Sequence, residues 1–262
     1  MAPADPRASM SEITRLFGNR ADAYASFRPQ YPEALFDWLA ANSPGRERAL
    51  DIACGNGQAS RPLLGRFQQV LACDGSPEQL RAAPDLAGIG CFAADAGAQP
   101  LSAASLDLIV VAQALHWFAT PEFFAETRRL LRPGGLFCAW CYSLLRIDDA
   151  LDALLDDFYW NTLGGYWPAG RASVDAGYRD IQPPFSRISV PAFAIELEWN
   201  LAQLEGYLGT WSAVQKLQQA SGRDPLLELQ PKLRQVWGDG QQKRFVRWPL
   251  HFLAGFPNPP HP

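Results

Sequence analysis

The sequence feature that most constrains the fold is the stretch LDIACGNGQAS, residues 50–60. A short apolar run ends at Ala53, the letters CGNG at 54–57 interrupt it, and from Gln58 the chain can continue as a helix. This order predicts a buried strand, a tight turn and a helix N-terminus. Glycine suits such a turn because a Cβ would hinder a positive φ or block the close approach of a ligand. The N–H groups of the turn favour a nucleotide-like or carboxylate-bearing ligand.

Strands and helices alternate on both sides of this turn and define the fold class. Strands are expected at about 49–53, 69–74, 90–93, 105–112 and 136–142, with helices over about 58–67, from Ser76 and from Thr120 to Leu131. The fourth strand, LDLIVVA, is almost continuously apolar, as in a parallel strand buried on both faces. The pattern predicts an α/β fold, a doubly wound and mostly parallel sheet that binds ligands beyond the carboxyl ends of its strands.

The flanking segments complete a single domain over 1–262. Residues 1–45 are expected to form a lid segment, with a short helix from Glu12, and then a helix over 33–41; residues 46–142 form the cofactor-binding half. Residues 143–184, helical and then rich in glycine and aromatic residues, form an insertion after the fifth strand that could cover the crevice. Residues 185–256 are expected to add a sixth strand (185–199), helices over 201–220 and 225–237, and a closing strand (243–252), for a seven-stranded sheet.

Composition excludes several function classes. A net charge of −4 argues against nucleic acid or an anionic membrane as the main partner. No apolar run approaches the roughly 20 residues of a transmembrane helix, and the N-terminus lacks a signal-peptide core, so we expect a cytoplasmic protein. The five cysteines are expected as reduced buried thiols, with Cys138 and Cys141 on opposite faces of one strand. No metal-binding constellation is present in the sequence.

Polar residues follow the ends of the first four predicted strands. The first strand ends at Asp51 and the glycine turn, and Asp74 ends the second, where an acid can accept two hydrogen bonds from vicinal ribose hydroxyls. Asp95 follows the third strand, where a carboxylate could accept from an adenine amino group, and Gln113 follows the fourth. Because these strand ends meet at one edge of a parallel sheet, the sequence predicts a nucleotide-like ligand there.

Five motifs occur in a fixed order along the chain: LDIACGNGQ, VLACDGSPEQL, AADA, LDLIVVAQALHWF and LRPGGLF. They resemble the motifs of class I S-adenosylmethionine-dependent methyltransferases of type 11, above all the small-molecule branch that includes trans-aconitate methyltransferase-like proteins. The resemblance runs from about residue 18 to the last strand and is strongest over 49–140. It implies a Rossmann-like sheet, S-adenosyl-L-methionine as cofactor, and direct methyl transfer to a carboxylate, hydroxyl or amine of a small molecule.

The resemblance also implies roles for individual residues. By position, Gly55 and Gly57 would meet the methionine moiety, and the ribose and adenine would be held by Asp74 and Asp95. Ala53 stands where the family has its first glycine. The other residues of these motifs that the resemblance places at the cofactor are Asp51, Ala53, Gly75, Ser76, Ala94, Ala96, Gln113 and Ala114.

Three further residues have implied or possible roles in the reaction. In the branch named above the N-terminal segment folds over the cofactor, so Tyr24 and Arg28 could meet its carboxylate, for which the planar fork of arginine is suited. His116 follows the fourth strand, close to where a methyl group would be presented, and is the candidate catalytic base. A neutral imidazole there could deprotonate a hydroxyl acceptor, whereas a carboxylate acceptor would need positioning alone.

The identity of the acceptor stays open in the sequence, as does the oligomeric state. Arg146, Arg171 and Arg179 could hold a carboxylate such as aconitate. Aromatic side chains can wall a pocket for an aromatic acceptor or pack in the core, and the candidates are Trp140, Tyr142, Tyr159, Trp160, Tyr166, Trp167, Tyr178 and Trp211.

Two other function classes share the glycine turn and the acid after the second strand. An NAD-dependent oxidoreductase would need glycine or alanine where Ser60 stands, and the sequence has no Tyr-x-x-x-Lys pair for hydride chemistry. A non-catalytic cofactor-binding protein would carry the same motifs as the enzyme. Fold alone does not decide between these functions.

Overall fold

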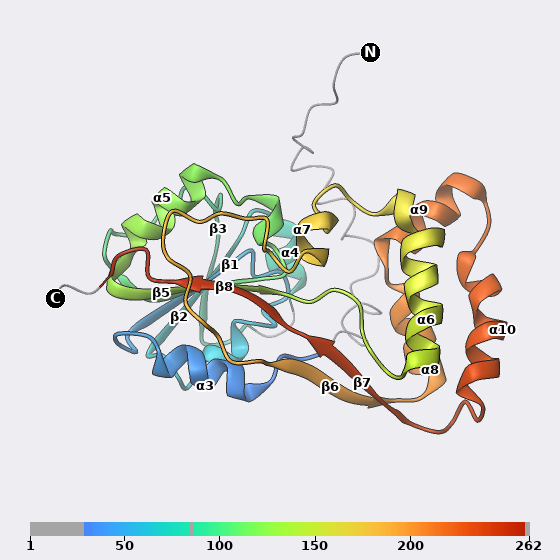
Figure 1. Cartoon of the computed structure of the whole chain (residues 1–262). Helices are drawn as coiled ribbons and strands as arrows, with labels where there is room; N and C mark the ends of the chain where they lie inside the picture. Colours follow the sequence, from blue (N-terminus) through green and yellow to red (C-terminus); the bar gives the residue numbers. More distant parts are fainter. Residues whose placement is uncertain (1–28, 84–85, 260–262) are drawn as a thin grey trace, which may run out of the picture.

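The computed structural model describes residues 29–83 and 86–259 and has a mixed α/β architecture (Figure 1). Its centre is a six-stranded sheet of order β3-β2-β1-β4-β5-β8, in which β8 alone runs antiparallel to its neighbour. The predicted doubly wound, mostly parallel sheet is thereby confirmed. Its strands are β1 (Arg48–Ile52), β2 (Gln69–Asp74), β3 (Ile89–Ala93), β4 (Leu106–Ala112), β5 (Leu131–Cys141) and β8 (His251–Gly255).

The prediction of seven strands in this sheet was wrong by one. The segment expected as a sixth strand divides in two: Arg187 makes only an isolated bridge to Gly255 at the sheet edge, while β6 (Ala194–Trp199) pairs with β7 (Arg244–Pro249) in a separate ribbon. Pro191 separates the two parts and has no N–H to donate to a ladder. The expected closing strand therefore becomes β7 and β8, with one residue, Leu250, between them.

Helices cover both faces of the six-stranded sheet. Helix α3 (Glu33–Ala41) packs Leu35, Phe36 and Leu39 on one face, and α5 (Pro121–Leu130) packs Phe123 and Phe124 on the other. Successive residues of each central strand alternate between the two cores, as the pleat requires.

The cysteines follow the same alternation. Cys138 belongs to the core under α3 and Cys141 to the core under α5, which confirms that the two thiols lie on opposite faces of β5. Both are free and buried, as are Cys54 and Cys73. Cys91 is also free, but it is exposed because it lies on the edge strand β3, so the expectation of burial was wrong for this residue.

The helix expected over 58–67 is reduced to one 3-10 turn, η1 (Arg61–Leu63). Gly65 adopts a φ of 78° directly after this turn, a left-handed conformation that cannot continue a right-handed helix. The next helix, α4 (Pro77–Ala82), forms as predicted: Ser76 Oγ accepts a hydrogen bond from the N–H of Gln79, and Pro77 occupies its first turn.

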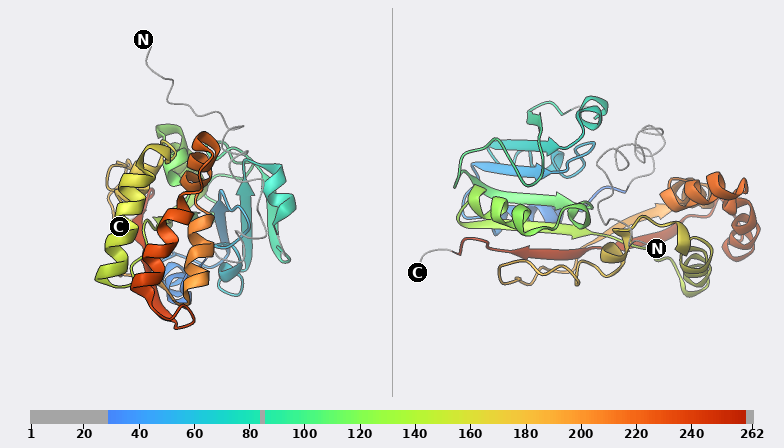
Figure 2. Two further views of the ribbon diagram at one scale, coloured as in Figure 1. Left: turned by 90° about the vertical axis from the view of Figure 1, so that its right-hand side faces the viewer. Right: turned by 90° about the horizontal axis from the view of Figure 1, so that it is seen from above.

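Helices α6 (Asp149–Asp157), α8 (Leu201–Gly209), α9 (Ser212–Ser221) and α10 (Pro225–Trp237) gather beyond one end of the sheet, on the ribbon formed by β6 and β7 (Figures 1 and 2). We call α6, α8, α9 and α10 the helical cap. The single helix expected over 201–220 is divided at Trp211, whose extended backbone ends one helix and starts the next. The other elements between β5 and β6 are the π-helical turn η3 (Phe158–Thr162), η4 (Gly164–Tyr166) and α7 (Arg171–Asp175).

The connection from the sheet to the cap is hydrogen-bonded to the ribbon. Arg146, where the chain leaves β5 for α6, exchanges two backbone hydrogen bonds with Arg247 of β7, at 2.8 and 2.9 Å. None of the helices in the described part of the chain is long and apolar enough to cross a membrane.

Candidate functional site

The carboxyl ends of the central strands are shaped by two non-glycine residues with positive φ. Ala53 follows β1 with a φ of 58°, and Gln113 follows β4 with a φ of 56°. The N–H of Gln113 donates to the carbonyl of Trp140 (2.8 Å), and its side-chain amide donates to the carbonyl of Tyr142 (2.9 Å). Such conformations cost free energy and cluster at functional sites, so this edge of the sheet is a candidate site on backbone grounds alone.

The two glycines of the turn serve different purposes. Gly55 has a φ of +52°, and a Cβ built on it would have no atom of a described residue within 4 Å. Gly57, with a φ of +76°, lies against the side chain of Leu86, which would collide with a Cβ there. Gly57 therefore allows close packing of protein, whereas Gly55 leaves room in front of the turn for a ligand.

Asp74, the last residue of β2, ties the glycine turn to its neighbours. Its Oδ2 accepts a hydrogen bond from the N–H of Gly55 (3.0 Å), and its Oδ1 accepts one from the N–H of Ser76 (2.9 Å). The backbone carbonyl of Asp74 accepts from the N–H of Ala94, after β3. Each carboxylate oxygen has lone pairs for a second donor, so Asp74 can hold the turn and still accept from two hydroxyl groups of a ligand.

Asp51 is a buried acid with an unused acceptor. Its side chain is 1% exposed, and its Oδ2 accepts from Ser60 Oγ at 2.5 Å. No described residue donates to its Oδ1. Burial raises the pKa of Asp51 to about 7, against the opposing effect of the Ser60 hydrogen bond. A buried oxygen without a donor, behind a turn with open space before it, fits a ligand that brings polar hydrogens, and S-adenosylmethionine carries both hydroxyl and ammonium donors.

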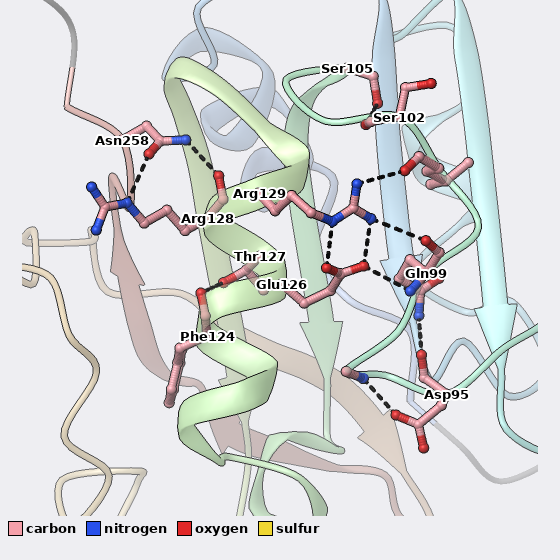
Figure 3. A network of polar contacts seen from close by, with 12 residues as sticks. Asp95, Gln99, Ser102, Ser105, Phe124, Glu126, Thr127, Arg128, Arg129 and Asn258 are labelled. Atoms are coloured by element: carbon pink, nitrogen blue, oxygen red, sulfur yellow. Dashed lines mark hydrogen bonds and ion pairs between the residues drawn. The ribbon is translucent and has the colours of Figure 1, made fainter.

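The loop that carries Asp95 is fastened to helix α5 by a polar network (Figure 3). Asp95 Oδ1 accepts from the N–H of Gly97, and the side-chain amide of Gln99 donates to the Asp95 carbonyl at 2.7 Å. The N–H of Gln99 donates to Glu126, which also pairs with Arg129 through two hydrogen bonds of 2.7 Å. We did not predict this network; the spacing of Glu126 and Arg129, three residues apart in an expected helix, was its only sequence signal.

The structure brings the predicted cofactor residues to one edge of the sheet, except two that lie outside the described residues, Tyr24 and Arg28. At Pro29 the described chain lies against the glycine turn, because its carbonyl accepts from the side-chain amide of Gln58 at 2.5 Å. The residues found after the ends of β1 to β4, or within the last two positions of a strand, are Asp51, Ala53, Gly55, Gly57, Asp74, Gly75, Ser76, Ala94, Asp95, Ala96, Gln113 and Ala114.

His116 lies in the 3-10 turn η2 (Leu115–Trp117), directly after this edge. Its Nδ1 is 3.3 Å from the hydroxyl of Tyr178, and its ring lines a cavity of about 370 Å³ that also includes Thr120 and Asp180. Burial, and to a lesser extent the positive charge of Arg171, lower the pKa of His116 to about 4, against the opposing effect of Asp180. The imidazole is therefore neutral at pH 7.

A second polar cluster lies where β5 gives way to the cap. Asp175 Oδ1 accepts from Ser143 Oγ (2.6 Å), from the Tyr159 hydroxyl (2.7 Å) and from Arg171 Nε (3.2 Å). We call these four residues the Asp175 cluster. Of its members the sequence had singled out only Arg171 and Tyr159, and the i,i+4 spacing of Arg171 and Asp175 was the signal for the acid.

No metal site accompanies these clusters. Within residues 29–83 and 86–259 no group of three or more histidine, cysteine or acidic side chains is placed to hold a metal ion.

Comparison with known proteins identifies the fold and the motifs. Residues 50–139 match the family model described as "Methyltransferase domain". The chain is 31% identical over 244 residues to a proposed methyltransferase of Dictyostelium discoideum, covering 90% of this chain and 93% of that protein.

Two further comparisons agree. A solved structure of a proposed type II methyltransferase from Anaeromyxobacter dehalogenans superposes with a TM-score of 0.84 and is 42% identical, covering 89% of this chain and 99% of the other. An uncharacterized methyltransferase of Mycobacterium tuberculosis is 36% identical over 130 residues, which is 48% of this chain and 52% of that protein.

Proposed function

The chain belongs to the class I S-adenosylmethionine-dependent methyltransferases, and from that membership we propose that it methylates a small organic molecule. The likeness to the Dictyostelium and Anaeromyxobacter proteins, over nearly the whole of each, establishes the family. It leaves no support for the oxidoreductase alternative. The acceptor class we propose, a carboxylate, hydroxyl or amine, is that of the small-molecule branch with trans-aconitate methyltransferase-like members, acting in the cytoplasm.

The residues at the sheet edge fit this cofactor. Asp74 would hold the ribose, Asp95 the adenine, and the open turn at Gly55 the methionine moiety, with Asp51 behind it. When bound, S-adenosylmethionine supplies a sulfonium-activated methyl group, which passes to an acceptor atom while the electrons of the broken C–S bond remain on sulfur. The protein's contribution is alignment and the exclusion of water.

The observation that carries the small-molecule proposal is the position of the helical cap. Ser143 of the Asp175 cluster follows Tyr142, whose carbonyl is bonded to Gln113 at the end of β4. The acceptor side is therefore continuous with the cofactor edge and is walled by buried and half-buried side chains. An acceptor site enclosed by such side chains would suit a small molecule better than a nucleic acid or a protein chain, and the net charge of −4 agrees with this.

The environment of His116 favours an acceptor that is already ionised. A general base must take up a proton, and a buried imidazole with a pKa of about 4 does so poorly. An acceptor that arrives ionised needs no base, so we propose that His116 contacts the acceptor and that proton removal is not required of it.

The test is transfer of a labelled methyl group. The purified protein is incubated with methyl-deuterated S-adenosylmethionine and matched panels of organic acids, phenols and amines, and products are identified by mass spectrometry. We expect a methylated member of one panel, and we expect Asp74→Ala to weaken binding of S-adenosylhomocysteine about 100-fold or more, since it removes charge-assisted hydrogen bonds to the ligand and the turn.

The control is Asp239→Ala, which also removes a carboxylate bonded to a backbone N–H, but in an exposed turn of the cap. It should leave binding unchanged. Binding of S-adenosylhomocysteine without methylation of any panel would favour the non-catalytic alternative. Methyl transfer to a protein or nucleic acid, with every small molecule inert, would contradict the proposal.

A further inference from the structure

Arg171 is held in place on one edge of its guanidinium group. Its Nε donates to Asp175 Oδ1 and to the hydroxyl of Tyr159, and the same Asp175 oxygen is bonded by Ser143. Neither Nη1 nor Nη2 makes a hydrogen bond to a residue within the described ranges, although the side chain is only 24% exposed. The fork is thus oriented by the Asp175 cluster, while its Nη edge remains available as a pair of donors.

Aromatic rings surround this fork. The Arg171 guanidinium carbon lies 4.8 Å from the ring centroid of Trp167 and 5.2 Å from that of Tyr159. Trp211, at the break between α8 and α9, contacts both rings, with centroids 5.6 Å apart in each case. A cation over aromatic faces is attracted to them and keeps its orientation, so the rings hold the fork and also provide an apolar wall next to it.

The fork is close to the residues at the sheet edge. Gly170, the residue before Arg171, lies against His116: a Cβ built on Gly170 would be 2.6 Å from His116 Cδ2. Ser143 of the Asp175 cluster is two residues beyond the end of β5, beside the anchor of Gln113. Gly170 and the Asp175 cluster therefore both border the residues that follow the end of β4.

The other two candidate arginines are placed differently. Arg146 is 45% exposed and pairs with Asp156 through hydrogen bonds of 3.0 and 3.1 Å. Arg179 is exposed. Only Arg171 among the three is fixed by a half-buried acid and bordered by aromatic rings.

We infer that Arg171 is the carboxylate-binding residue for the methyl acceptor, and that the acceptor is an organic acid with a flat or apolar body. The Nη edge would pair with the two carboxylate oxygens, since the planar fork matches their spacing, and Trp167 and Trp211 would cover the adjoining carbon skeleton. This inference rests on the proposed function, because it names the acceptor of the same site.

A simpler explanation for the Asp175 cluster is that it only fastens α7 to the π-helical turn η3. Such a structural contact would need only Arg171 Nε and Asp175, and it would not affect the binding of any ligand. The two explanations differ in what the Nη donors do, so binding of matched acids and amides separates them.

The experiment measures ligand binding to the protein loaded with S-adenosylhomocysteine, by calorimetry, with trans-cinnamate, phenylacetate and hexanoate and their primary amides as probes. At least one acid should bind about 10- to 100-fold more tightly than its amide, as a charge-assisted pair predicts. That preference should be lost in Arg171→Met and reduced in Arg171→Lys, which keeps the charge but not the fork. Arg179→Met, an equal loss of charge on the exposed surface nearby, should keep the preference.

Each outcome bears on the inference. Equal binding of acids and amides by the wild type, no binding of any acid, or a preference that survives in Arg171→Met would overturn it. Because Arg171→Met leaves Asp175 without its cation, the variant's unfolding curve and its affinity for S-adenosylhomocysteine are measured alongside, and Arg171→Lys is the substitute if the methionine variant does not fold. Failure of the wild type to bind S-adenosylhomocysteine would count against the proposed function itself and is read before any acid is added.

Discussion

The cofactor side and the acceptor side of this site are built by different means. On the cofactor side, the shape comes from backbone: strand ends, two glycines, and N–H groups bonded to Asp74, nearly all within residues 51–96. On the acceptor side, the shape comes from side chains of the segment between β5 and α9, residues 143–211. Substitutions on the cofactor side should therefore weaken binding of the cofactor. Substitutions on the acceptor side should change binding of the acceptor and leave cofactor affinity unchanged.

After Asp74→Ala, the largest effect is expected from a methyl group added to the open turn. Gly55→Ala would cost about 1–2 kcal/mol in backbone strain and place its Cβ where a ligand approaches. By analogy with overpacking, binding of S-adenosylhomocysteine should weaken about 10- to 100-fold, measured by calorimetry. Gly65→Ala is the matched control, because Gly65 also has positive φ and open space but follows η1. Equal loss of binding in both variants would show that strain alone is responsible.

The buried carboxylate of Asp51 should lower the unfolding free energy of the protein at alkaline pH. Because its folded pKa is about 7 and its unfolded pKa about 3.8, the native state binds more protons between these values, and its unfolding free energy falls as the pH rises through that window. Asp51→Asn should therefore raise the unfolding free energy at pH 8 by about 1–3 kcal/mol, with little gain at pH 4, in urea denaturation.

The control for this variant is the equally buried Asp107, which is paired with Arg132 and accepts from two backbone N–H groups. Asp107→Asn should destabilise the protein at both pH values. If Asp51→Asn were also less stable than the wild type at pH 8, the carboxylate of Asp51 would stabilise the fold, and the prediction would be wrong.

Removing an aromatic wall should separate the two sides. Trp211→Leu is expected to raise the KM for the acceptor about tenfold, from lost apolar contact, with no change in the affinity for S-adenosylhomocysteine. Trp160→Leu, in the same part of the chain but 54% exposed, should change neither quantity. A parallel loss of cofactor affinity in Trp211→Leu would mean that the two sides are not independent.

The smallest effect is expected in the network of Figure 3. Arg129→Gln removes a partly exposed ion pair that holds the Asp95 loop, so binding of S-adenosylhomocysteine should weaken about threefold. Arg128, the adjacent residue, points the other way and bonds Asn258, so Arg128→Gln should leave binding unchanged. Identical affinities of the two variants for S-adenosylhomocysteine would show that the network does not contribute to cofactor binding.

The cofactor side could be predicted from the sequence because its determinants are local. Patterns of only a few residues predict these features: the glycines at 55 and 57, the acid that ends β2 and the apolar run of β4. Their convergence follows from the rule that parallel strands end at one edge. The reason for Gly57 did not follow, because Leu86, which packs against it, comes from another part of the chain.

The acceptor side depends on tertiary packing and was predicted only in outline. The sequence shows three arginines and many aromatic residues after β5, but not that Asp175 selects one arginine or that Trp211 interrupts a helix. The absent helix after the glycine turn is similar: residues 58–67 are compatible with a helix, and the positive φ of Gly65 decides against it. Side-chain clusters and single residues with left-handed backbone depend on the packing of the whole fold, so local sequence patterns do not predict them.

The antiparallel pairing of β5 and β8 has a consequence for the variation of this enzyme. The two strands are neighbours in the sheet, and residues 142–250, which include the whole helical cap, form the connection between them. Such a connection can change as long as β5 and β8 remain paired, since the free-energy cost of closing a loop grows slowly with length. Residues of the acceptor side can thus be lengthened, shortened or exchanged while every central strand keeps its neighbours, so one cofactor platform can serve many acceptors.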